Sequence, residues 1–504
     1  MREHRVLSRP ARGLCLALIV LLSAPSLARA EGPAESIDLA SAVRAALEKN
    51  PGLRAALLSY RRAQQDVLTE EGRYWPSLVL EGGATHLENP GFGAAGGTVV
   101  PTNDGIQLAS ELRHTFPWGT ALALRLEGSR VAGRVQFGAG AAQLVELGPG
   151  YGLLGKLSLR QPILRGFGTG VGEALLRQAR LGRSLAEHDR DQTSSALLRD
   201  VMVAYWELWY AERALRIDQA AFELAVRQRD EADKQIRAGA RAPVDLYSYE
   251  TRVADLELAK IASEAVWRER GIELQTLLGR EAPLAPSLHA ADAIAPEPPV
   301  PDAGATLAAA MEESLEVLQL KAQLELARDK RIAAGDGDRP RLDLEAYVQA
   351  QGLGNQEVPP AFEQFASLDA VSAHVGLSFE LPLSGQRLDA ERRSAELAAE
   401  AIAARLLATQ QTIQASVGQE LLRLEQARRR IALATTTATI AERNVKARQE
   451  RYDHGDGILL EVYEAQDTLR RALLSVERGR VDSVQAALRL DHLSGALLRR
   501  QRPE

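Results

Sequence analysis

A run of glycines between Arg165 and Leu176 is the first candidate for chemistry, because glycine-rich loops that open a helix bind phosphate groups. Such loops have the spacing Gly-x-Gly-x-x-Gly, or contain Gly-Lys followed by Ser or Thr. Neither pattern occurs here, and the last glycine of the run is followed by Glu173. We interpret the run as a hinge in which glycine lets a strand turn sharply into a helix. Its members are Gly166, Gly168, Gly170 and Gly172.

Metal binding and side-chain catalysis have little support in the sequence. The only cysteine is Cys15, and the histidines lack the short spacing of metal ligands. No set of nucleophile, base and acid stands out, so we expect neither an enzyme nor a bound cofactor or metal. The scattered histidines are His86, His114, His188, His289, His374, His454 and His492.

Residues 1–30 have the pattern of a cleaved secretory signal peptide: a basic start, an apolar run over Leu14–Leu22, and Ala28-Arg29-Ala30. The chain has a net charge of −6, and removal of this mostly basic segment makes the mature chain more acidic. That charge argues against nucleic acid as a partner.

The mature sequence lacks an apolar run of ~18 residues that would predict a membrane helix. The mature protein could therefore be soluble, bound to a surface or inserted in a membrane as a β-barrel.

The chain contains an internal repeat. Residues 237–247 align with 453–463, and the same offset carries Leu277-Leu278-Gly279 onto Leu493-Ser494-Gly495. We therefore predict a first structural repeat over 31–279 and a second over 305–504. Residues 280–304 between them are rich in proline and are expected to form an extended linker.

Alternating apolar residues predict strands, and two long segments predict helices. Residues 342–348 and 371–381 alternate with a period of two, as a sheet with one apolar face does. This pattern suits a transmembrane barrel and equally a soluble, half-buried sheet. Residues 172–238 and 386–453 are each long enough for a helix of roughly 100 Å. Such a rod with lipid-facing strands has to be closed by copies of itself.

A set of short motifs occurs in order over nearly all of the mature chain: Leu39, Ala42, Ala46-Leu47, Asn50-Pro51, Trp75-Pro76-Ser77-Leu78, Leu159-Arg160-Gln161-Pro162, Ala238-Gly239, Asp245, Leu277-Leu278-Gly279, Gly455, Glu461-Val462 and Ala465. In these residues the sequence resembles the TolC-like outer-membrane efflux family. The resemblance implies a fold of mixed α and transmembrane β structure. In that fold a trimeric β-barrel in the outer membrane is continuous with a long periplasmic α-helical coiled-coil barrel, and each subunit gives four strands.

The resemblance also implies a function. Members are passive exit ducts of tripartite efflux pumps or type I secretion systems, and they work with a periplasmic adaptor protein and an inner-membrane transporter. We expect the same here, with outer-membrane lipid around the barrel. The alternative is an exported periplasmic coiled-coil scaffold or adhesin without a channel.

One segment departs from the family pattern. The stretch between Pro76 and Pro162 is longer than its counterpart in the second repeat and contains an additional alternating pair near 106–130. We favour a hairpin that projects beyond the barrel over an eighteen-strand trimer, because a wider barrel would not match the helical tunnel below it.

The resemblance assigns roles to residues at the periplasmic end. Glu461 and Glu464 match constriction carboxylates, and they are three apart and so share one helix face. Tyr452 and Asp245 match a hydrogen-bonded latch. A second latch uses an arginine where this chain has Gly457, so we expect a gate that opens more easily.

Two further sets of residues follow from the same comparison. The turns between the paired helices are expected to dock the adaptor: Gly239, Ala240, Arg241, Pro243, Gly455, Asp456 and Gly457. The hinges between barrel and tunnel are expected at Pro76, Pro162, Gly166, Gly168, Pro340 and Pro382.

Overall fold

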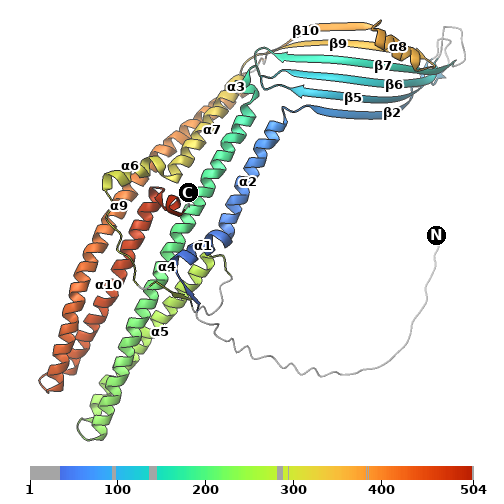
Figure 1. Cartoon of the computed structure of the whole chain (residues 1–504). Coiled ribbons are helices and arrows are strands. Elements are labelled where there is room, and N and C mark those ends of the chain that lie inside the picture. The colour runs from blue at the N-terminus through green and yellow to red at the C-terminus, as the bar shows by residue number, and fades with distance from the viewer. Residues whose placement is uncertain are drawn as a thin grey trace, which may run out of the picture.

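The chain forms a long layer of helices with a β-sheet at one end (Figure 1). The structure is a computed structural model that describes residues 35–92, 98–135, 145–280, 288–292, 294–381, 383 and 385–501. The predicted signal peptide, residues 1–30, and Pro382 lie outside the described residues. Among the described residues, no helix combines the length and the apolar character needed to cross a membrane.

Six long strands form one antiparallel sheet in the order β10-β9-β7-β6-β5-β2, so β10 and β2 are its two edges (Figure 1). Their bounds are β2 (Ser77–Glu88), β5 (Thr102–Thr115), β6 (Ala121–Val135), β7 (Val145–Pro162), β9 (Arg341–Asn355) and β10 (Val371–Glu380). Two small pairs lie outside it, namely β3 (Gly91–Phe92) with β4 (Thr98–Val99), and β1 (Glu35–Ile37) with β8 (Leu288–Ala290).

The additional pair of strands belongs to this sheet, so the prediction of a projecting hairpin is wrong. Strands β5 and β6 lie between β2 and β7, with Ser77 opposite Arg113 and Ala121 opposite Arg160. In a projecting hairpin, the backbone N–H and C=O groups on the outer side of each strand would be unpaired. In the observed register these groups pair with the neighbouring strands, and apolar and polar side chains alternate in step across them. The sheet of this chain therefore has six strands rather than the four that the resemblance implied.

The two faces of the sheet differ in polarity. Directly opposed pairs place Leu78 with Leu112, and Leu157 with Leu124, on one face. This face is apolar and open to the surroundings, for example at Leu80, which is 73% exposed. On the other face, Arg125 pairs with Glu81, Glu111 and Glu127 at 3.1, 3.3 and 3.0 Å.

The helices run away from the sheet and pack side by side (Figure 1). Helix α9 contacts α7 and α10, and α4 contacts α2, α5, α7 and α10. Helix α4 has 64 residues and α9 has 68, which corresponds to roughly 100 Å at 1.5 Å per residue. The bounds are α1 (Leu39–Lys49), α2 (Pro51–Gly72), α3 (Thr169–Gly172), α4 (Ala174–Arg237), α5 (Leu246–Leu277), α6 (Ala303–Glu313), α7 (Leu315–Gly337), α8 (Pro359–Ser367), α9 (Gln386–Asp453), α10 (Leu459–Leu493) and α11 (Ala496–Gln501), with a 3-10 turn at Pro243–Asp245.

Local signals set several of these boundaries. The Asn50 side chain accepts a hydrogen bond from the backbone of Leu53 at 3.1 Å and caps α2, which begins at Pro51. Asp302 caps α6 in the same way through the backbone of Ala305 at 2.7 Å. Both caps satisfy N–H groups that have no partner within the helix.

The main core lies in the middle of the helical layer. Trp209, Tyr205, Leu274 and Leu278 are fully buried there. The proline-rich linker is anchored to this core, because β8 pairs in parallel with β1 and the indole of Trp209 donates to the Asp292 carbonyl at 2.8 Å. The described part of the linker around β8 is thus packed against the helices.

Candidate functional site

Two helix-turn-helix tips lie at the end of the molecule far from the sheet, one between α4 and α5 and one between α9 and α10 (Figure 1). Gly239 and Gly455 have φ angles of 74° and 83° in these turns. Glycine adopts this left-handed backbone without the steric cost that other residues pay. At Gly457, an added Cβ would lie 3.2 Å from the backbone nitrogen of Tyr452, so the second turn is also closely packed.

A cluster of three polar side chains joins the two tips, and we call Arg241, Tyr249 and Tyr452 the tip cluster. The two phenol oxygens are 2.9 Å apart. The Arg241 guanidinium donates to both, with a distance of 3.0 Å to Tyr249, and it lies 5.1 Å from the ring centre of Tyr452. Burial, followed by the hydrogen bond with Tyr452, raises the pKa of Tyr249.

The expected bond between Tyr452 and Asp245 is absent from this structure. Asp245 is exposed at the end of the 3-10 turn, and its side chain has no hydrogen bond or ion pair among the described residues. Tyr249, one helical turn further along, lies on the buried side of α5 and takes the position beside Tyr452. Sequence reasoning assigned Arg241 only to the docking surface and missed its contact with Tyr452, for which a basic side chain within a short turn was the signal.

Further ion pairs join the two helical hairpins away from the turns. Arg252 on α5 binds Asp467 on α10 through two bonds of 2.6 and 3.1 Å, a bidentate geometry that carboxylates favour. Arg252 also lies 5.4 Å from the ring centre of Tyr463, whose pKa burial raises to about 12. Arg470 on α10 reaches the buried Asp218 on α4 at 2.7 Å.

The two predicted constriction carboxylates have different surroundings. Glu461 forms an ion pair with Arg448 of α9 within the same hairpin. Glu464 is exposed, and its carboxylate has no partner among the described residues. In one subunit, therefore, Glu464 carries an uncompensated negative charge while the charge of Glu461 is balanced.

The predicted hinge residues lie where the sheet meets the helices. Gly166 and Gly168 have φ angles of 85° and 90°, and the N–H of Gly166 donates to Asp336 at 2.8 Å. Pro76 directly precedes β2, and Pro162 ends β7. Pro340 directly precedes β9. The glycine run thus connects β7 to α4 and is bonded to the end of α7.

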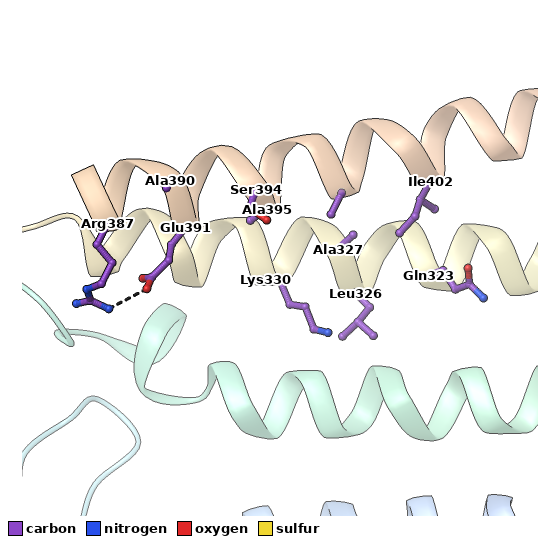
Figure 2. A pocket seen from close by; sticks show the side chains of 11 residues that line it. Gln323, Leu326, Ala327, Lys330, Arg387, Ala390, Glu391, Ser394, Ala395 and Ile402 are labelled. Carbon is purple, nitrogen blue, oxygen red and sulfur yellow. Dashed lines mark hydrogen bonds and ion pairs between the residues drawn. The ribbon is translucent and has the colours of Figure 1, made fainter. Parts of the chain in front are cut away.

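A groove of about 750 Å³ lies between α7 and α9 (Figure 2). Its lining includes Ala390, Ala395 and Ala398, and Arg387 is paired with Glu391 at 2.8 Å. The lining contains neither histidine nor cysteine, and its one carboxylate, Glu391, is the partner of Arg387. Among the described residues, no group of three or more potential metal-binding side chains occurs.

Comparisons with known proteins agree with this geometry. Residues 306–496 match the family model described as outer membrane efflux protein. The second half of the chain therefore carries the sequence pattern of the outer membrane efflux protein family. Members of this family are channels and not enzymes, and they form trimers and work with adaptor proteins and inner-membrane transporters.

Several solved structures of outer membrane efflux proteins share the fold. VceC, an outer membrane protein from the bacterial pathogen Vibrio cholerae, has 15% identity and a TM-score of 0.63, with 91% of this chain and 96% of that chain covered. The Campylobacter jejuni CmeC outer membrane channel has 14% identity, a TM-score of 0.65 and coverages of 91% and 85%. The open state of the Neisseria gonorrhoeae MtrE outer membrane channel has 16% identity and a TM-score of 0.60, with 91% of this chain and 89% of that chain covered. A comparison with curated proteins finds no match.

Proposed function

We propose that three copies of this chain form an exit duct through the outer membrane, with the sheet in the bilayer and the helices in the periplasm. The observation that carries this proposal is the two-faced sheet with unpaired edge strands β2 and β10. An apolar face that covers six strands suits lipid, and a face bearing the Arg125 charge network suits a water-filled lumen. Pairing β2 of one copy with β10 of the next would satisfy both edges.

The helical layer supports the same closure. The contacts order its far half as α9, α10, α4 and α5, so α9 and α5 are the outer helices. Each exposes large apolar side chains, with Leu258 on α5 at 67% and Leu433 on α9 at 70%. Such side chains suit burial against a neighbouring helix, which in the proposed trimer is α5 of one copy against α9 of the next.

The tips are proposed to form the gate and the adaptor-docking surface. Three copies of Glu464 around the axis concentrate negative charge, which attracts cations and repels anions. The tip cluster and the Arg252–Asp467 pair hold the two hairpins of each subunit together in the closed state. The turns from Gly239 to Pro243 and from Gly455 to Gly457 are proposed to contact an adaptor in a tripartite pump or a type I secretion system, and Gly239, Ala240, Pro243, Gly455 and Asp456 are exposed there.

Planar-bilayer conductance of the detergent-purified protein tests this function. We expect a small, cation-preferring conductance that rises about two- to fivefold in Tyr452→Phe, because the substitution removes a hydroxyl that bonds both Arg241 and Tyr249. Tyr247→Phe is the matched control, since that tyrosine is 68% exposed and its hydroxyl has no partner among the described residues.

Two results would count against the proposal. Folded, inserted protein that carries no current in either form would favour the scaffold or adhesin. If conductance rose equally in Tyr247→Phe, the tip cluster would not control the gate, although the protein would still be a duct.

A further inference from the structure

A groove lies beside helix α8 on the apolar face of the sheet, near the middle of strands β2, β5, β6 and β7. Its volume is about 510 Å³. The side chains that line it from this face are mostly apolar: Leu80, Leu108, Leu126, Leu153, Phe362 and Phe365, together with Ser110.

Small residues in the sheet make room for α8. A Cβ added to Gly155 would lie 2.9 Å from the ring of Phe365, and one added to Gly352 would lie equally close to the Cβ of the same residue. Real Cβ atoms essentially never approach so closely, so the sequence of β7 and β9 is adapted to a helix on this face. Helix α8 is therefore a fixed wall of the groove.

An arginine without a partner lies next to the groove on the same face. Arg130 on β6 is directly opposite Ile106 on β5 and Tyr151 on β7. Gly128 and Leu108, which line the groove, are the next residues on the same face of β6 and β5. Its guanidinium has no hydrogen bond or ion pair among the described residues, whereas Arg134, further along the same strand, pairs with Glu146 at 3.2 Å. A guanidinium on an apolar face is costly unless an anion compensates it.

We propose that the groove and Arg130 bind lipid A, the phosphorylated and multiply acylated lipid of the outer leaflet. An acyl chain fills the groove between Leu108 and Phe365, and a phosphate group pairs with Arg130. The proposal rests on the outer-membrane orientation proposed above, because only that orientation places Arg130, in the half of β6 that lies away from the long helices, towards the outer leaflet. Cationic side chains beside apolar surface are the general means of recognising anionic lipid headgroups.

Native mass spectrometry of the detergent-purified protein, titrated with bis-phosphorylated hexa-acyl lipid A, tests this site. We expect Arg130→Gln to raise the dissociation constant about tenfold, the usual cost of losing a charge-assisted bond. Gly128→Leu fills the groove from its floor, where an added Cβ would have ordinary contact with Leu153 at 3.7 Å, and should weaken binding similarly. Arg134→Gln is the matched control, because that arginine already has a carboxylate partner, and it should leave binding within about twofold.

The remaining outcomes separate lipid A from other sources of the signal. Monophosphoryl lipid A and dioleoyl phosphatidylglycerol should both bind more weakly than bis-phosphorylated lipid A. Equal binding of phosphatidylglycerol, or equal loss in Arg134→Gln, would overturn the proposal in favour of nonspecific lipid attraction. Conductance of Arg130→Gln in bilayers that lack lipid A should match the wild type, so failure of the lipid site and failure of the duct are distinguishable.

Discussion

The middle of the helical layer and its two tips are held together by different forces. In the middle, Trp209 and Leu274 are fully buried, and the phenol of Tyr205 donates to Asp292. Burial there raises the pKa of Tyr205. This region combines apolar burial, which is worth roughly 1.5–3 kcal/mol for each large side chain, with hydrogen bonds that fix the linker.

At the tips, polar contacts replace this core, and of the side chains that make them only Tyr249 is buried. The tip cluster and the Arg252–Asp467 pair join hairpins whose turns are open to solvent. Because water competes for such groups, these contacts contribute little net free energy and break at little cost. The difference teaches that, in the proposed duct, a stable middle would allow the tips to separate without unfolding the molecule.

Trp209→Ala has the largest expected effect and tests the stability of the middle. Removing this buried indole leaves a cavity and an unpaired Asp292 carbonyl, which should cost about 3–5 kcal/mol. Chemical denaturation followed by the helical circular dichroism signal measures the loss. Trp75→Ala is the control, because that indole is 74% exposed at the junction with the sheet, and a change there within about 0.5 kcal/mol is expected. Equal losses at both positions would contradict the picture of a stabilising middle.

His492 supplies a pH dependence that belongs to the middle alone. Burial, with Arg199 nearby, lowers the pKa of His492 from 6.5 to about 4, and its Nδ1 lies 2.8 Å from the Ser195 hydroxyl. Between these two pH values the unfolded chain binds a proton that the folded chain does not. The free energy of unfolding therefore keeps the full contribution of neutral His492 above pH 6.5. Between pH 6.5 and pH 4 this contribution falls by up to about 1.4 kcal/mol per pH unit.

Substitution separates this effect from the general effect of acid. In His492→Gln the loss of stability between pH 6.5 and pH 4 should be smaller, and denaturation midpoints at half-unit intervals measure it. His454→Gln, at the exposed tip of α9, should follow the wild-type curve. If both variants flatten the curve equally, the pH dependence does not reside in the middle.

Sequence reasoning predicted the features that depend on neighbouring residues. The extent of α9 and the two glycine turns follow from local pattern, and α9 spans Gln386–Asp453 as expected. Sequence reasoning failed for contacts between residues that are far apart in the chain. The insertion of β5 and β6 into the sheet is a matter of strand register, and Arg241 meets Tyr452 although 211 positions separate them. The partner of Glu461, Arg448, lies across a turn that the spacing of the two carboxylates does not reveal.

Asp467→Asn tests the contacts near the tips. It should reduce the free energy of unfolding less than Trp209→Ala does, but it should clearly raise the open fraction of the proposed duct. The substitution weakens the bidentate pair with Arg252, the contact that links α5 to α10. A loss of about 1 kcal/mol from the closed state would raise the open fraction about fivefold while the denaturation midpoint stays nearly constant. Single-channel recording measures the open fraction.

The matched control for Asp467→Asn is Asp482→Asn, on the same helix. Asp482 pairs with Arg478 at 2.7 Å within α10 and with Arg430 of α9 at 3.4 Å, so both of its partners belong to one hairpin. Breaking these pairs leaves the connection between the hairpins intact, and the open fraction should not change. An equal increase in both variants would mean that opening follows general loosening of the helices, and the contrast between middle and tips would not explain gating.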